Sequence, residues 1–225
     1  MHLDRLRANV ERVRERIRAA CARAGRRPED VTFVAITKYV APPVIEALGA
    51  CGVTDCGENR VVEGLARVAQ VRHPFRWHFV GHVQTNKVRK LVGAFPIVHS
   101  IDRWELAAEL QRQLDLNKMR VTGFVQVNVS GESTKGGVAP AECVALVERI
   151  RRECHRIGLS GLMTMAPHVE DAGASRPHFR RLRDLAAACG VAGLSMGMTA
   201  DFEAAVEEGA THVRVGSALF EGIAT

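Results

Sequence analysis

The chain has 225 residues, of which 47% are hydrophobic and 25% are charged. This composition excludes a disordered chain, and no apolar run approaches the roughly 20 residues of a membrane span, so we expect a soluble globular protein. The net charge is +6, but the basic residues alternate with glutamates along helical segments, which argues against nucleic-acid binding. Because the amino terminus has no hydrophobic signal segment, we expect a cytoplasmic protein.

The six cysteines form no C-x-x-C pair and have no histidine partner at the spacing of metal ligands. We therefore expect reduced, mostly buried thiols and no metal site. These cysteines are Cys21, Cys51, Cys56, Cys143, Cys154 and Cys189.

In chain order, apolar residues first repeat at helical spacing over residues 3–24 and stop at Gly25, which predicts a leading helix. After it, short β-branched runs alternate with helix-patterned segments. The predicted strands are 31–37, 53–56, 76–80, 96–99, 121–128, 159–163, 191–195 and 212–215. The predicted helices are 42–50, 59–71, 84–92, 102–116 with Asp102 as N-cap, 140–154, 175–189, 200–208 and a last turn after Gly216-Ser217.

Eight strand-helix units in 225 residues favour parallel strands that close into a single (β/α)₈ TIM barrel, preceded by the extra helix. We expect one domain over residues 1–225, because no linker interrupts the alternation. An open, doubly wound sheet is the alternative. It is disfavoured because no G-x-G-x-x-G follows the first strand.

Polar and glycine-containing clusters follow five of the predicted strands, on the face where barrel enzymes build their sites. If the strand assignment holds, all five clusters surround one pocket. They are Lys38, Gly57-Glu58-Asn59, His82, Ser195-Met-Gly197-Met-Thr199 and Arg214-Val-Gly216-Ser217.

Lys38 ends the apolar run that forms the first strand. A buried ammonium is costly unless it is paired, neutral or covalently consumed, although a lysine can also extend its amine to solvent. By strand alternation Lys38 shares a side with Val34 and Ile36, whereas Tyr39 lies on the opposite side. If the even positions face the barrel axis, Lys38 points into the pocket mouth and Tyr39 points away, toward the helices.

The segments after strands seven and eight resemble a phosphate-binding cup. Thr199 is placed to cap helix 200–208, Gly197 permits close backbone approach, and Gly216-Ser217 opens the last turn. Ordinary capping would explain the same residues. Arg214 adds a cation that can contact a phosphate or a ring nitrogen. Alternatively, Arg214 forms an ion pair inside the barrel.

A lysine that faces a phosphate cup suggests a phosphorylated carbonyl compound held as a Schiff base. Pyridoxal 5'-phosphate is one candidate, and a phosphorylated sugar in a lysine-type aldolase is another. The residues alone do not separate the two.

Several segments together resemble the pyridoxal phosphate homeostasis protein family, from about residue 8 to 222. They are Val34-Ala-Ile-Thr-Lys38, Cys56-Gly-Glu-Asn-Arg-Val-Val-Glu63, Trp77-His-Phe-Val-Gly-His-Val-Gln-Thr-Asn-Lys87, Val98-His-Ser-Ile-Asp102, Val127-Asn-Val-Ser-Gly-Glu-Ser-Thr-Lys-Gly136, Gly161-Leu-Met-Thr-Met165 and Leu194-Ser-Met-Gly-Met198.

The resemblance implies a barrel like the amino-terminal domain of alanine racemase, without that enzyme's carboxy-terminal domain. It implies that Lys38 forms the Schiff base with pyridoxal 5'-phosphate, that Asn59 and His82 lie near the cofactor ring, and that Arg214 lies close by. The residues implied around the phosphate are Ser195, Gly197, Met198, Thr199, Gly216 and Ser217. Thr199-Ala200 and Ser217 depart slightly from the family's usual residues, which puts only individual contacts in doubt.

The family's role implies a cofactor carrier that acts in pyridoxal phosphate homeostasis and in amino-acid and keto-acid balance, without turnover. A racemase needs acid-base groups on both faces of its substrate, and the only tyrosine here is Tyr39. The second base is missing unless His82 or a partner supplies it, so we expect a binding protein rather than an enzyme, with an amino-acid racemase as the alternative. PLP-dependent apoenzymes are possible partners, and we expect a monomer.

Overall fold

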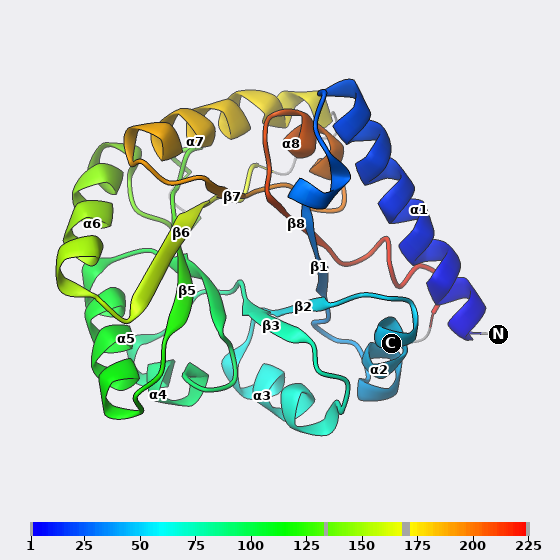
Figure 1. The fold of residues 1–225 in the computed structure, drawn as a ribbon, viewed down its shortest axis with the longest axis horizontal. Helices are drawn as coiled ribbons and strands as arrows, with labels where there is room; N and C mark the ends of the chain where they lie inside the picture. The colour runs from blue at the N-terminus through cyan, green and yellow to red at the C-terminus, as the bar shows by residue number, and fades with distance from the viewer. Residues whose placement is uncertain (1, 133–134, 168–171, 224–225) are drawn as a thin grey trace.

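The computed structural model describes residues 2–132, 135–167 and 172–223. Eight parallel strands close into a barrel in the order β1 to β8, with β8 paired back to β1 (Figure 1). The predicted (β/α)₈ barrel is therefore confirmed. The strands are β1 (Thr32–Ile36), β2 (Asp55–Glu58), β3 (Arg76–Phe79), β4 (Ile97–Ile101), β5 (Val121–Gln126), β6 (Ile157–Met163), β7 (Gly193–Ser195) and β8 (His212–Val215).

The helices form a ring outside the barrel (Figure 1). The α-helices are α1 (His2–Arg23), α2 (Pro42–Ala50), α3 (Val61–Gln70), α4 (Val88–Leu91), α5 (Trp104–Leu116), α6 (Pro140–Glu153), α7 (Arg176–Ala188) and α8 (Phe202–Glu207). Three short 3₁₀ helices are η1 (Pro28–Asp30), η2 (Thr85–Lys87) and η3 (Ala172–Ser175). No helix in the described ranges is long and apolar enough to cross a membrane, and the cytoplasmic location stays a prediction.

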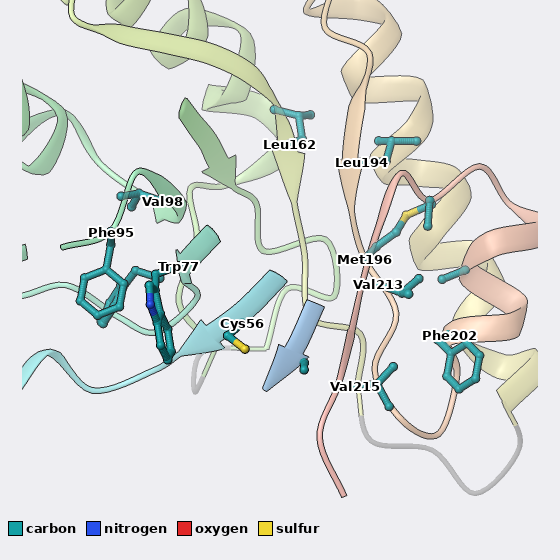
Figure 2. Packing of buried hydrophobic residues seen from close by; sticks show 14 of the residues in the cluster. Cys56, Trp77, Phe95, Val98, Leu162, Leu194, Met196, Phe202, Val213 and Val215 are labelled. Atoms are coloured by element: carbon teal, nitrogen blue, oxygen red, sulfur yellow. The ribbon is translucent and has the colours of Figure 1, made fainter. Parts of the chain in front are cut away.

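The main hydrophobic core lies between the strands and the surrounding helices. Trp77, Leu162 and Val213 leave their strands toward this layer, which also contains Phe95 and Phe202 (Figure 2). Side chains alternate between the two faces of each strand, so every second strand residue contributes to this layer. All six cysteines are free and buried, which confirms the prediction of buried thiols.

The leading helix α1 packs outside the barrel beside α8 and α2. Its buried face includes Leu6, Val13 and Ile17, which recur at helical spacing as the sequence predicts. The Asn9 side-chain amide donates hydrogen bonds to the carbonyls of Leu219 and Glu221. This helix therefore fixes the segment that follows β8.

Several element boundaries differ from the prediction. Strand β2 is 55–58 instead of 53–56, so Gly57 and Glu58 belong to the strand and not to the loop after it. Strand β5 ends at Gln126, and β6 begins at Ile157. The predicted helix 84–92 divides into η2 and α4, and helix 200–208 shortens to six residues.

Asp102 does not cap α5 as predicted. The N-cap position is Arg103, which has no side-chain cap hydrogen bond. The Asp102 carboxylate instead accepts from the Arg103 guanidinium at 2.5 Å and lies 3.2 Å from His82 Nδ1. An ion pair with the neighbouring arginine therefore replaces the cap.

The inside of this barrel is unusually polar. Barrel interiors are usually filled by branched aliphatic side chains, and Val34, Phe124 and Met163 are buried here outside the main core cluster. Polar side chains share the interior with them. They are Asp55, His78, His99, Ser195, His212 and Arg214, joined by hydrogen bonds or ring contacts.

Candidate functional site

A cavity of about 640 Å³ opens at the carboxyl ends of the barrel strands. Residues from every strand end except that of β4 line it. It contains eight of the ten predicted site residues, which the structure therefore brings together: Lys38, Asn59, His82, Met198, Thr199, Arg214, Gly216 and Ser217.

Lys38 follows β1 and lines this cavity together with Ile36. The predicted parity of β1 is confirmed on this side, because Val34 and Ile36 contact the position where a side chain on the facing Gly57 would lie. Among the described residues, no hydrogen bond or ion pair holds Lys38 Nζ. Its amine is thus available to a ligand in the cavity.

Tyr39 does not line the cavity, which agrees with the prediction that it points away from the pocket, but it is exposed to solvent instead of buried toward the helices. Its side chain is 59% exposed, and its ring centroid lies 5.9 Å from Lys38 Nζ and 5.5 Å from the Arg60 guanidinium carbon. The reason is its backbone, which takes a left-handed conformation with φ of 67° and so interrupts the strand alternation. The only tyrosine of the sequence therefore lies near the lysine without lining the cavity.

Ser195 and Gly197 are not among the residues that line the cavity. Ser195 is fully buried, and its Oγ lies 2.6 Å from Arg214 Nη1 and 2.7 Å from His99 Nδ1. Gly197 has φ of 88°, and a Cβ there would lie 2.5 Å from that of Ala205. These two residues support the lining from beneath instead of facing the cavity.

The cavity-lining loops after β7 and β8 carry backbone N–H groups without an acceptor in the described part of the chain. Within the described ranges, no acceptor meets the N–H groups of Thr199, Ala200 and Ser217, and all three residues line the cavity. Free backbone N–H groups that converge on one place form an anion-binding concavity.

The details of this cup differ from the prediction. Thr199 does not cap a helix, since its hydroxyl accepts from the Gly216 N–H at 3.3 Å. Helix α8 begins only at Phe202, with Asp201 at the N-cap position, and Gly216-Ser217 opens a turn instead of a helix. The donors of this cup are therefore N–H groups of two loops, and the Thr199 hydroxyl links the loop after β7 to the loop after β8.

Arg214 supplies the positive charge next to these amides. It is 4% exposed, and its guanidinium donates to Ser195 Oγ and to the Thr164 carbonyl at 2.8 Å. Burial lowers the pKa of Arg214 to about 10, against the opposing effect of Asp201. Arg214 therefore stays charged at neutral pH without a carboxylate in direct contact among the described residues.

Asn59 and His82 lie on the opposite part of the lining, after β2 and β3. Asn59 Oδ1 is buried and has no hydrogen-bond partner in the described part of the chain, which leaves it free to meet a polar ligand atom. His82 is exposed and lies 3.2 Å from Asp102. Both therefore offer polar groups to a ligand in the cavity.

Some lining residues were not predicted from the sequence, including Gln126, Met165 and Asp201. The Asp201 carboxylate accepts from the Met198 N–H at 2.7 Å and so shapes the loop after β7. Gln126 ends β5, and position at a strand end was the signal that could have revealed it. Glu58 and Gly57, by contrast, were expected at the pocket and do not line it.

Comparison with known proteins agrees with this architecture. Residues 1–223 match the family model of the alanine racemase N-terminal domain. Alanine racemase from Clostridium difficile is 16% identical with a TM-score of 0.76, and the match covers 99% of this chain and 57% of that protein. The fold and its lysine-bearing mouth thus place the chain in the class of alanine racemase N-terminal-domain barrels.

Closer relatives define the family within this class. The pyridoxal phosphate homeostasis protein of Aquifex aeolicus is 42% identical over 218 residues, covering 94% of this chain and 95% of that protein. PipY of Synechococcus elongatus, solved with PLP bound, is 32% identical with a TM-score of 0.80, covering 92% of this chain and 99% of PipY. The chain belongs to the pyridoxal phosphate homeostasis protein family.

Proposed function

We propose that this chain binds pyridoxal 5'-phosphate at Lys38 and holds it for intracellular cofactor homeostasis. The observation that carries the proposal is the unpaired Lys38 amine, which shares one cavity with the free amides of the β7 and β8 loops. When bound, pyridoxal phosphate supplies an aldehyde that condenses with a primary amine. Lys38 provides this amine, and residues 1–225 act as the single binding domain.

The other groups of the cavity fit the same ligand. The N–H groups of Thr199, Ala200 and Ser217 are donors for a phosphate. Arg214 can only donate hydrogen bonds, so it suits an oxygen or a ring nitrogen that offers a lone pair. Asn59 Oδ1 is a buried acceptor without a partner, which suits a hydroxyl or N–H of the ligand.

Carriage without turnover is the role that we propose for this site. A racemase must place an acid-base group on each side of the substrate carbon, and besides Lys38 the titratable groups among the described lining residues are His82, Asp201 and Arg214. We infer that the bound cofactor exchanges with PLP-dependent apoenzymes and that the chain acts as a monomer, with secondary effects on amino-acid and keto-acid pools.

Whole-protein mass spectrometry after incubation with pyridoxal phosphate and borohydride tests the binding role. One cofactor mass should be fixed on Lys38, and Lys38→Ala should abolish the trapping. Lys87→Ala is the matched control, because Lys87 lies in η2 and does not line the cavity. Trapping on another lysine, or a mass gain with a sugar phosphate alone, would contradict the proposal.

An amino-acid racemase is the second candidate function, because Tyr39 lies near Lys38. Its ring centroid lies 5.9 Å from Lys38 Nζ, although Tyr39 is not among the residues that line the cavity. Loss of the α-deuterium from labelled alanine measures this activity. The carrier role predicts negligible washout, whereas rapid washout that Tyr39→Phe and Lys38→Ala both abolish would establish the racemase.

A further inference from the structure

A continuous chain of side-chain hydrogen bonds crosses the inside of the barrel and ends at Arg214. Asp55 Oδ1 lies 2.9 Å from His78 Nε2, and His78 Nδ1 lies 2.8 Å from His99 Nε2. His99 Nδ1 is 2.7 Å from Ser195 Oγ, which is 2.6 Å from Arg214 Nη1. Of the five residues, only Arg214 lines the cavity.

The chemistry of the two ends fixes the two terminal hydrogen bonds of this chain. A guanidinium only donates and a carboxylate only accepts, so Ser195 Oγ accepts from Arg214, and Asp55 accepts from His78 Nε2–H. With both imidazoles neutral, His99 Nε2–H donates to His78 Nδ1, and the Ser195 hydroxyl donates to His99 Nδ1. Every donor then meets one acceptor, from Arg214 to Asp55.

This chain of hydrogen bonds lies in a tightly packed, buried environment. His78, His99 and Ser195 are fully buried, and the His99 ring stacks on Phe124 with centroids 4.5 Å apart and 12° between the planes. Burial lowers the pKa of His99 well below the ordinary range of histidine, which agrees with a neutral ring. At the far end, Arg76 and Thr54 also donate to Asp55 and keep it ionised.

Arg214 needs such support, because a buried cation without a carboxylate partner is poorly solvated. Ser195 Oγ and the Thr164 carbonyl are the acceptors that meet its guanidinium among the described residues. Hydrogen bonds in a buried chain polarise one another and strengthen together. Since Ser195 directs its own hydrogen toward His99, its lone pair faces Arg214.

We propose that Asp55, His78, His99 and Ser195 are positioning residues that fix the guanidinium of Arg214 for its ligand in the cavity. The inference rests on the proposed binding of pyridoxal phosphate. It adds that residues as far as the opposite side of the barrel interior determine the affinity for this ligand. None of these four residues touches the cavity, so they act through Arg214 alone.

Paired substitutions at His99 separate hydrogen bonding from ring packing. His99→Met fills much of the space but breaks both bonds, and it should raise the Kd for pyridoxal phosphate about fivefold, the effect typical of losing a hydrogen bond between neutral groups. His99→Gln keeps one acceptor and one donor and should restore affinity to within about twofold. His212→Asn is the matched control, because His212 packs against the same rings but bonds to Thr211 instead.

The outcomes distinguish this inference from the binding proposal itself. If the unaltered protein binds no pyridoxal phosphate, the proposed function fails. If it binds and His99→Met matches His212→Asn, or if His99→Gln binds as weakly as His99→Met, the positioning chain is wrong. Near-ultraviolet circular dichroism of each variant checks that the barrel remains packed.

A measurement on the ligand-free protein tests the chain of hydrogen bonds even if a variant fails to fold. Nitrogen-15 NMR of the histidine rings at neutral pH should find His78 and His99 both neutral, with the hydrogen on Nε2. A hydrogen on Nδ1 of either ring would overturn the proposed bond direction. Asp55→Asn, which weakens the far end, should shift the His99 ring resonances and raise the Kd in the same direction as His99→Met.

Discussion

The Thr37 hydroxyl donates a hydrogen bond of 2.6 Å to the fully buried carboxylate of Glu58. Arg67 completes this arrangement by pairing with the other Glu58 oxygen at 3.1 Å and donating to the Val40 carbonyl at 3.2 Å. The turn between Thr37 and Val40, which carries Lys38, is therefore held from its outer side by β2 and α3. Glu58 supports the site without lining it.

Thr37→Val should lower the free energy of unfolding by about 1–3 kcal/mol, because the substitution leaves a buried carboxylate oxygen without its donor. Urea denaturation measures this change. Thr122→Val is the matched control, since the Thr122 hydroxyl has no side-chain hydrogen bond among the described residues. Equal stabilities of the two variants would show that the Glu58 contact contributes nothing.

Arg214→Gln should weaken retention of pyridoxal phosphate by tenfold or more, because the substitution removes the only guanidinium among the described lining residues. Ser217→Ala should weaken it by only about twofold, since the backbone N–H that we assign to the phosphate remains. Absorbance titration gives both affinities. Arg112→Gln on the surface of α5 is the control, and unchanged affinity in Arg214→Gln would refute the role of the cation.

Stability should fall on acidification between about pH 6.5 and pH 4. Burial lowers the pKa of His212 to about 4 and that of His99 well below 6.5. Because the unfolded chain binds these protons more readily, the stabilisation is complete above the unfolded pKa and is lost as the pH falls. His212 alone accounts for a loss of about 2 kcal/mol at pH 5.

Chemical denaturation at pH 8 and pH 5 measures this loss. His212→Asn should reduce it, whereas His155→Asn should not, because His155 is exposed on the surface near Asp115. A pH dependence identical in all three proteins would show that His212 is not the group responsible. The lowered pKa of Asp55 does not affect this comparison, because Asp55 changes the stability only at pH values near and below the ordinary pKa of aspartate.

The barrel and most of the lining were predictable because both depend on local pattern. Strand-helix alternation predicts the fold, and position after a strand predicts the place of Lys38, Asn59 and His82. The exposed position of Tyr39 was not predicted because strand alternation assumes a negative φ, and nothing in the sequence signals the left-handed backbone at that residue. Local pattern therefore locates a strand end better than it orients the residue after it.

The buried polar chain was not predicted, because it depends on contacts between distant strands. His78 and His99 lie on β3 and β4, and Ser195 follows much later on β7. A signal existed in the polar residues at inward positions of otherwise apolar strands, but only barrel closure brings them into one network. Ser195 was predicted at the phosphate, and its assignment to the cofactor stays a prediction.

Close backbone contact at Gly161 gives the sharpest test of barrel packing. A Cβ at Gly161 would lie 1.9 Å from the Gly193 carbonyl oxygen, where β6 pairs with β7. Gly161→Ala should therefore separate these strands and lower the free energy of unfolding by more than about 2 kcal/mol. The disturbance should also reach His99, because a Cβ at Gly193 would already touch the Phe124 ring on which His99 stacks.

Gly158→Ala in the same strand is the control. There the nearest atom to an added Cβ is the Val121 carbonyl oxygen at 3.6 Å, which is ordinary contact, and Gly158 is exposed. This variant should stay within about 1 kcal/mol of the unaltered protein, since alanine also reduces the entropy of the unfolded chain. Similar denaturation midpoints for the two alanine variants would mean that β6 and β7 can move apart freely, and the rigid support assigned to Ser195 and Arg214 would then be wrong.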